Sequence, residues 1–87
     1  MRSLGKNRKD ISGMKQGLWE FNYFNGNIAR KGSYKDDLAE GEWRYYFENG
    51  QLYSKGSYVN GNKDGMWEYY NKDGSLDRKI LYGIMGI

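Results

Sequence analysis

A period of 24 residues runs through most of this chain. Trp19, Trp43 and Trp67 lie 24 residues apart. Other positions keep the same interval without a gap: Gly17, Gly41 and Gly65; Gly26, Gly50 and Gly74; Lys31, Lys55 and Lys79; Tyr34, Tyr58 and Tyr82; Phe21, Tyr45 and Tyr69; Ile28, Leu52 and Leu76. A fixed period of this length indicates a stack of similar supersecondary units.

Each unit has the pattern of a β-hairpin. In the second copy Trp43, Tyr45 and Phe47 alternate with other residues, and alternation at period two places them on one face of a strand. Asn49-Gly50 follows, and this dipeptide predicts a tight turn with positive φ at both central residues. A longer turn, at residues 59–65, is predicted to lead into the next hairpin.

The return strand of the second copy, residues 52–58, alternates in the same way. One face is predicted to carry Leu52, Ser54, Gly56 and Tyr58, and the other Tyr53, Lys55 and Ser57. The chain is therefore predicted to be all-β, an antiparallel meander of tandem 24-residue hairpins with about six strands. These strands are expected to form one elongated, twisted sheet.

Two glycines fall in the middle of return strands, Gly32 and Gly56. Glycine weakens a strand interior unless another group needs the space. We therefore expect an aromatic ring from a neighbouring strand to lie across each glycine. Ile80 occupies this position in the third copy and is interpreted as the mark of a terminal unit.

The repeat divides the chain into a leader, residues 1–16, and a repeat domain, residues 17–87, with copies at 17–40, 41–64 and 65–87. Residues 12–16 resemble residues 60–64, so the leader is interpreted as holding a degenerate half-repeat. The leader has five basic side chains and one acidic, and the remainder has nine basic and ten acidic. The repeat domain therefore lacks the basic balance typical of nucleic-acid binding. The leader is expected to be solvated and mobile.

The composition argues against catalysis. The chain has no Cys and no His, which removes thiol nucleophiles, the commonest general base and the commonest zinc ligands. The carboxylates fall mostly in predicted turns, and no two are placed as an acid–base pair. We therefore predict a protein that is not an enzyme and has no metal or cofactor.

No apolar run approaches the roughly 20 residues of a membrane-spanning helix. The basic first residues are not followed by the apolar stretch of a signal peptide. A cytoplasmic location is expected.

The repeat resembles a known family. Its order of Gly, Trp, Tyr, Asn-Gly, Gly and Tyr, seen at Gly41, Trp43, Tyr46, Asn49-Gly50, Gly56 and Tyr58, is similar to the MORN-repeat variant found in tandem in bacterial proteins. The resemblance covers residues 17–82, with departures at Asn22 and Ile80. It implies a hairpin-repeat scaffold that binds a protein partner. Many such proteins are classed as antitoxin-like, which implies neutralisation of a partner by direct contact.

Cell-wall repeats that bind choline or glucan offer a competing resemblance. They also carry Trp-Tyr-Tyr before Asn-Gly, but their aromatic residues are adjacent, whereas Arg44 separates Trp43 from Tyr45 here. This comparison leaves one alternative function open, the binding of lipid headgroups or cell-wall glycans through the aromatic rows.

The aromatic residues fall into two predicted groups. The repeat core is predicted to consist of Trp19, Trp43, Trp67, Tyr34, Tyr58 and Tyr82. A partner-binding surface on the opposite face is predicted to consist of Tyr46, Tyr53, Tyr70, Arg44 and Lys55. Half-exposed tyrosines beside polar residues suit protein recognition, because tyrosine adds contact area at low entropic cost.

The stretch 80–87 is the most apolar part of the chain. An apolar edge strand can pair with another strand. Folding back as a cap, self-association through edge strands and strand addition by a partner all remain open here.

Overall fold

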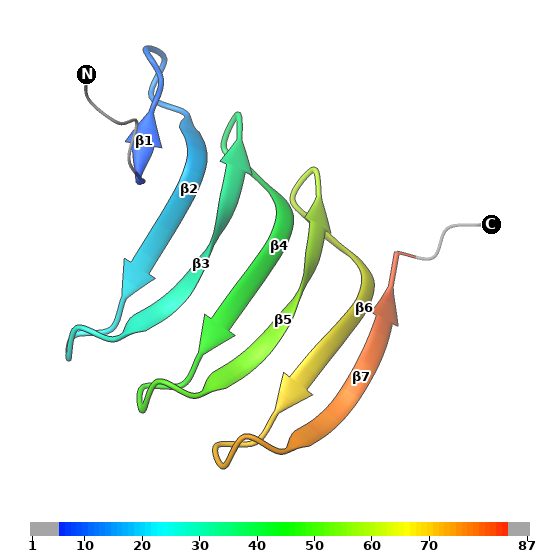
Figure 1. The fold of residues 1–87 in the computed structure, drawn as a ribbon. Helices are drawn as coiled ribbons and strands as arrows, with labels where there is room; N and C mark the ends of the chain where they lie inside the picture. The colour runs from blue at the N-terminus through cyan, green and yellow to red at the C-terminus, as the bar shows by residue number, and fades with distance from the viewer. Residues whose placement is uncertain (1–5, 84–87) are drawn as a thin grey trace.

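The computed structural model describes residues 6–83 and contains seven strands and no helix in that range. The strands are β1 (Arg8–Lys9), β2 (Lys15–Asn22), β3 (Ile28–Lys35), β4 (Leu38–Tyr46), β5 (Leu52–Val59), β6 (Asn62–Tyr70) and β7 (Leu76–Tyr82). They form one open sheet in chain order, and every neighbouring pair is antiparallel (Figure 1). The predicted all-β, single-sheet meander is confirmed. The molecule extends 42 × 41 × 21 Å.

The leader contributes a strand, so the expectations of about six strands and of a mobile leader are wrong for its described part, residues 6–16. β1 pairs with the start of β2, with Arg8 opposite Gln16. The Asp10 carboxylate closes the intervening loop by accepting hydrogen bonds from the backbone N–H groups of Ser12 (2.9 Å) and Met14 (3.0 Å). These bonds hold the pKa of Asp10 down at about 2, with the Met14 N–H as the largest cause.

The Asn-Gly turns differ from the predicted geometry. Gly50 has φ +94° but Asn49 does not have a positive φ, and the loop is closed by Phe47, whose N–H donates to the Gln51 carbonyl (2.8 Å). The loop has three residues, as in a hairpin in which a glycine follows an ordinary turn. The Asn49 side chain stabilises it by accepting the N–H of Gln51 (2.9 Å). The first and third copies repeat this arrangement, with φ +95° at Gly26 and +94° at Gly74.

The turn with two positive φ angles lies at the other end of the sheet. Asn60 and Gly61 have φ values of +51° and +84°, and they alone separate β5 from β6. Asp36 and Asp37 do the same between β3 and β4, at +52° and +70°. The tight and the long turns are therefore exchanged relative to the prediction, because Asn and Asp tolerate positive φ without a following glycine.

A β-bulge in each hairpin changes the predicted faces. Tyr45 pairs with Ser54 and Tyr46 pairs with Leu52, so Tyr53 is an extra residue in β5. The expectation that Leu52 shares a face with Ser54 is wrong, because Leu52 now lies opposite Tyr46. The predicted face of Tyr53 is also wrong, since its ring lies 5.1 Å from Phe47 and 6.1 Å from Tyr69, between ring centroids. An extra residue shifts side-chain alternation by one.

The face that carries Trp19, Trp43 and Trp67, here called the aromatic face, holds the core. Trp43 and Trp67 are 1% and 0% exposed, although nothing but their own sheet is present to cover them. Tyrosine rings alternate with the indoles and meet them edge to face, as Tyr34 and Tyr58 do with Trp43 (5.0 and 6.0 Å). Such pairs contribute roughly 0.5–1.5 kcal/mol each beyond the area they bury.

The mid-strand glycines make room for these indoles. A Cβ at Gly32 would lie 2.1 Å from the Trp43 ring, and one at Gly56 would lie 2.2 Å from the Trp67 ring. The prediction that a ring lies across each glycine is confirmed. Ile80, at the same position of β7, packs against the core as a cross-strand partner of Trp67. β7 is the last strand of the described sheet.

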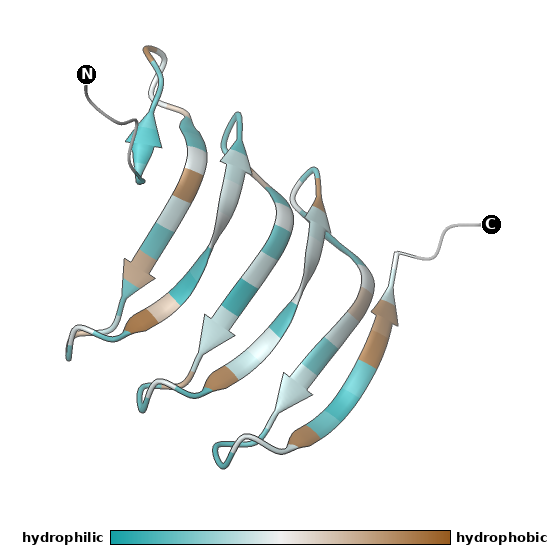
Figure 2. Cartoon of the chain, in the orientation of Figure 1, coloured by the Kyte–Doolittle hydropathy of each residue, from teal (hydrophilic) through white to brown (hydrophobic). Residues whose placement is uncertain are grey.

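Hydrophobic and hydrophilic residues alternate in bands along most strands (Figure 2). The aromatic face accounts for one set of positions. The other set lies on the opposite face, here called the second face, and includes the charged residues at the centres of the strands.

Candidate binding surface

A row of charged side chains crosses the middle of the second face. Cross-strand pairing aligns Glu20, Lys31, Arg44, Lys55, Glu68 and Lys79 from β2 to β7. Three neighbours in this row, Lys31, Arg44 and Lys55, have the same sign, and they are called the cation row below. Like charges directly opposite each other destabilise a sheet.

Acidic side chains neutralise part of this row. Glu68 lies 3.8 Å from both Lys55 and Lys79, and Glu42 accepts a hydrogen bond from Arg44 Nε at 3.1 Å. The Arg44 side chain is still 45% exposed, and that of Lys55 is 38% exposed. Pairs as exposed as these contribute little to stability. The cations are therefore available to an external group.

An apolar row runs beside the cation row, nearer the Asn-Gly turns. It consists of Ile28, Tyr46, Leu52, Tyr70 and Leu76, with Leu52 opposite Tyr46 and Leu76 opposite Tyr70. The Tyr70 hydroxyl donates to Glu68 (2.6 Å), which lowers the pKa of Glu68 and raises the pKa of Tyr70. Tyr46 and Tyr70 are half-buried. The bulge creates this row, because it turns the aliphatic residue of each copy onto the second face.

Shallow recesses flank the two rows. One of about 290 Å³ is lined by Leu18, Glu20, Lys31, Gly32, Ser33, Glu42 and Arg44. A second, of about 230 Å³, is lined by Glu42, Lys55, Gly56, Ser57, Met66 and Glu68. A third, of about 350 Å³, contains Ile28 and Tyr46 of the apolar row. The second face thus offers an undulating surface rather than one deep pocket.

The aromatic face is covered by cations of its own. Lys63 lies 4.8 Å from the Trp67 ring centroid, and Arg30 lies 3.8 Å from that of Phe21. Lys15 and Arg78 occupy the equivalent positions of other copies, 5.1 Å from Tyr34 and 4.9 Å from Tyr69. The middle copy has Ala39 and Ser54 at these two positions, and Ser54 lines a recess of about 220 Å³ with Tyr53 and Lys63.

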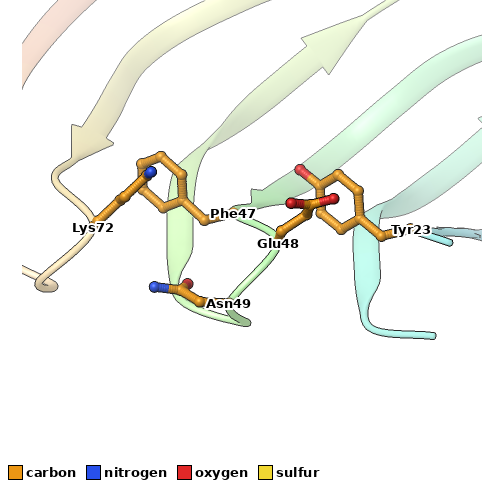
Figure 3. Close-up of a pocket in the computed structure, with 5 residues that line it drawn as sticks. All are labelled: Tyr23, Phe47, Glu48, Asn49 and Lys72. Carbon is orange, nitrogen blue, oxygen red and sulfur yellow. The ribbon is translucent and has the colours of Figure 1, made fainter. Parts of the chain in front are cut away.

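A larger recess, of about 470 Å³, lies among the hairpin turns. It is lined by Tyr23, Phe47, Glu48, Asn49 and Lys72 (Figure 3). The Tyr23 hydroxyl donates to the Tyr46 carbonyl (2.5 Å), and the Asn27 side chain donates to the Glu48 carbonyl (2.9 Å). These bonds tie the first turn to the second, which explains the polar residues here by structure alone.

Nothing in the described range is arranged for metal or membrane chemistry. No group of three or more His, Cys, Asp or Glu residues converges within residues 6–83. No helix able to cross a membrane is found in the part of the chain that the structure describes.

The structure brings together four of the five residues predicted to bind a partner. Tyr46, Tyr70, Arg44 and Lys55 share the second face, and Tyr53 lies on the aromatic face instead. Sequence analysis did not assign a binding role to Lys31 or to the aliphatic members of the apolar row. Comparing the copies would have indicated Lys31, because Arg44 stands where the other copies have Glu20 and Glu68.

The fold and its two faces define an open hairpin-repeat sheet with surfaces suited to binding. The model of the MORN repeat variant matches residues 15–36, 39–60 and 63–82, and the chain belongs to this family. MORN repeats are generally binding modules, for protein or for membrane lipid, and the family is non-catalytic. No curated protein and no solved structure matches the chain.

Proposed function

We propose that this chain is a protein-binding module and that its second face is the contact surface. The observation that carries the proposal is the position of Tyr46 and Tyr70, half-exposed, beside Arg44 and Lys55. Tyrosine and arginine are enriched in protein interfaces, and an apolar centre bordered by charges is the usual arrangement. The recesses beside the cation row give a partner's side chains places to pack.

The alternative, stacking of headgroups or glycans on the aromatic rows, has less support. A ligand can stack only on a ring with an exposed face, and Trp43 and Trp67 are 1% and 0% exposed. Lys63 already lies over the Trp67 ring. Tyr53 is 42% exposed and is the best remaining platform, but it is a single ring.

An antitoxin-like role is an extension of the same proposal. A broad face can cover the functional site of a toxic protein without any chemistry of its own, and the family resemblance supports this use. The proposal places the meeting of the two proteins in the cytoplasm. Fractionation of cells that express the tagged chain tests the location.

Tyrosine substitutions on the two faces test the proposed surface. The double variant Tyr46→Ser, Tyr70→Ser removes the aromatic part of the second face, and Tyr53→Ser removes an exposed tyrosine from the aromatic face. Affinity capture from cells, followed by mass spectrometry, is expected to lose a specific protein with the double variant and to keep it with Tyr53→Ser. Equal capture by all three proteins would refute the second face as the contact surface. Strong binding to lipid vesicles or glycan arrays, lost with Tyr53→Ser, would favour the alternative.

A further inference from the structure

We propose that the cation row of Lys31, Arg44 and Lys55 docks an acidic segment of the partner protein, a short run of Asp or Glu side chains. The inference rests on the proposed function and adds the chemistry of the partner.

The internal repeat provides the first argument. Positions 20, 44 and 68 are equivalent, and the first and third copies place a glutamate there, opposite Lys31 and Lys79. The second copy places Arg44 opposite Lys55, and Arg44 also faces Lys31 on its other side. A glutamate at position 44 would pair with both lysines, so folding alone favours glutamate. The arginine lowers the stability of the sheet, and an acidic ligand offsets that loss.

The second argument is incomplete neutralisation within the sheet. No acidic side chain among residues 6–83 lies within ion-pair distance of Lys31. Glu68 is shared between Lys55 and Lys79 at 3.8 Å from each, and the Glu42 that meets Arg44 is itself 54% exposed. The centre of the row therefore keeps a positive charge that an incoming carboxylate can neutralise.

The size and the border of the row indicate a peptide. Adjacent strands lie about 4.8 Å apart, so three cations span roughly 10 Å, the reach of two or three neighbouring carboxylates. Glu20, Glu42 and Glu68 border the row. A nucleic acid or an anionic membrane presents negative charge over a much wider area and would meet these glutamates. The adjacent apolar row receives the uncharged side chains of the same segment.

Arg44→Glu is the test variant, and Lys79→Glu is its control. Both change the net charge by the same amount, but Lys79 lies outside the cation row, beyond Glu68. The probe is a fluorescein-labelled hexaglutamate peptide, with hexalysine and Gly-Ser peptides as references, followed by fluorescence anisotropy at low salt. We expect binding of hexaglutamate alone. Arg44→Glu weakens it about tenfold or more, and Lys79→Glu weakens it less than about threefold.

The same variant has an opposite effect on stability. Arg44→Glu is expected to raise the melting temperature by about 2–4 °C, because it restores the charge alternation of the other copies. Loss of binding together with a gain in stability separates a docking role from a structural one. A lower melting temperature would overturn the first argument.

Three other results would overturn the inference: no binding of hexaglutamate, equal losses with Arg44→Glu and Lys79→Glu, or tighter Arg44-dependent binding of an oligonucleotide or of phosphatidylserine vesicles. The proposed function fails separately, when the tyrosine variants capture the same proteins as the unmodified chain.

Discussion

The substitution Gly56→Ala tests the packing of the sheet most sharply. An alanine in place of a strand glycine is ordinarily stabilising, by about 0.4–1 kcal/mol, because it restricts the unfolded chain. Here the new Cβ would lie 2.2 Å from Cδ2 and 2.3 Å from Cε2 of Trp67. Optimal carbon contacts are about 3.5–4.0 Å, so the ring or the strand must move by more than about 1 Å.

Trp67 has little freedom to move. Its ring is 0% exposed, and its Nε1–H donates to the Ser57 carbonyl at 3.0 Å. Overpacking of this kind costs about 1–3 kcal/mol, and weakening of the indole hydrogen bond adds about 1 kcal/mol. After the entropic gain from alanine, we expect a net loss of about 2–3 kcal/mol in the free energy of unfolding. The melting temperature falls by about 10–20 °C for a chain of this size.

Thermal and urea unfolding, followed by circular dichroism and tryptophan fluorescence, measure the effect. Ile80→Ala is the matched control, since it places alanine at the equivalent position of the third copy, where it removes volume instead of adding it. Its expected loss is smaller, about 1–2 kcal/mol, because Ile80 is only partly buried. A Gly56→Ala protein as stable as the unmodified chain would refute the proposed contact between Trp67 and the glycine.

Three further predictions concern the turns, the leader and the tyrosine hydroxyls. Gly50→Val places a β-branched residue at φ +94° and is expected to cost about 2–3 kcal/mol in urea unfolding; an unchanged midpoint would contradict the observed turn. The pKa of Asp10 is lowered from 3.8 to about 2, so its stabilisation of the β1–β2 loop is complete above about pH 4 and is lost as the pH falls through about 2. An NMR titration of the Ser12 and Met14 amides checks this, and Asp10→Asn should abolish the transition. Tyr45→Phe removes the hydrogen bond between the Tyr45 and Tyr58 hydroxyls (2.7 Å) at a cost of about 0.5–1.5 kcal/mol, and because burial raises the pKa of Tyr45, the variant should lose the last step of an absorbance titration; loss of an early step would contradict the burial of this hydroxyl.

Much of the fold follows from the repeat. The period identifies the unit, alternation identifies the two faces around Trp43, and Gly32 and Gly56 mark where the rings lie. These features are local, and each copy repeats them, so they reinforce one another.

The bulge could not be read from the same pattern. One extra residue at Tyr53 moves Leu52 to the other face, and alternation alone contains no sign of it. The turn types were exchanged for a related reason, because Asn-Gly is compatible with both geometries. Asp36-Asp37 shows that the tight turn here does not require glycine.

The cation row depends on the register between successive hairpins. Lys31 meets Arg44 because one residue of β3 faces three residues of β4 between the pairs Lys31–Arg44 and Ser33–Glu40, around Gly41 with φ +74°. The period fixes the pairing within a hairpin, but it does not fix this offset. The sequence therefore indicated Arg44 and Lys55 without showing that Lys31 completes the row.

The central claim, that the second face is the binding surface, can be tested in one NMR experiment. Uniformly ¹⁵N-labelled protein is titrated with hexaglutamate peptide, and the backbone amides and the three indole Nε1–H groups are followed together. The account predicts saturable shifts at Lys31, Arg44 and Lys55, with the indole signals of Trp43 and Trp67 unchanged on the opposite face. Shifts confined to the indole signals and to Tyr53, with the cation row unmoved, would contradict it.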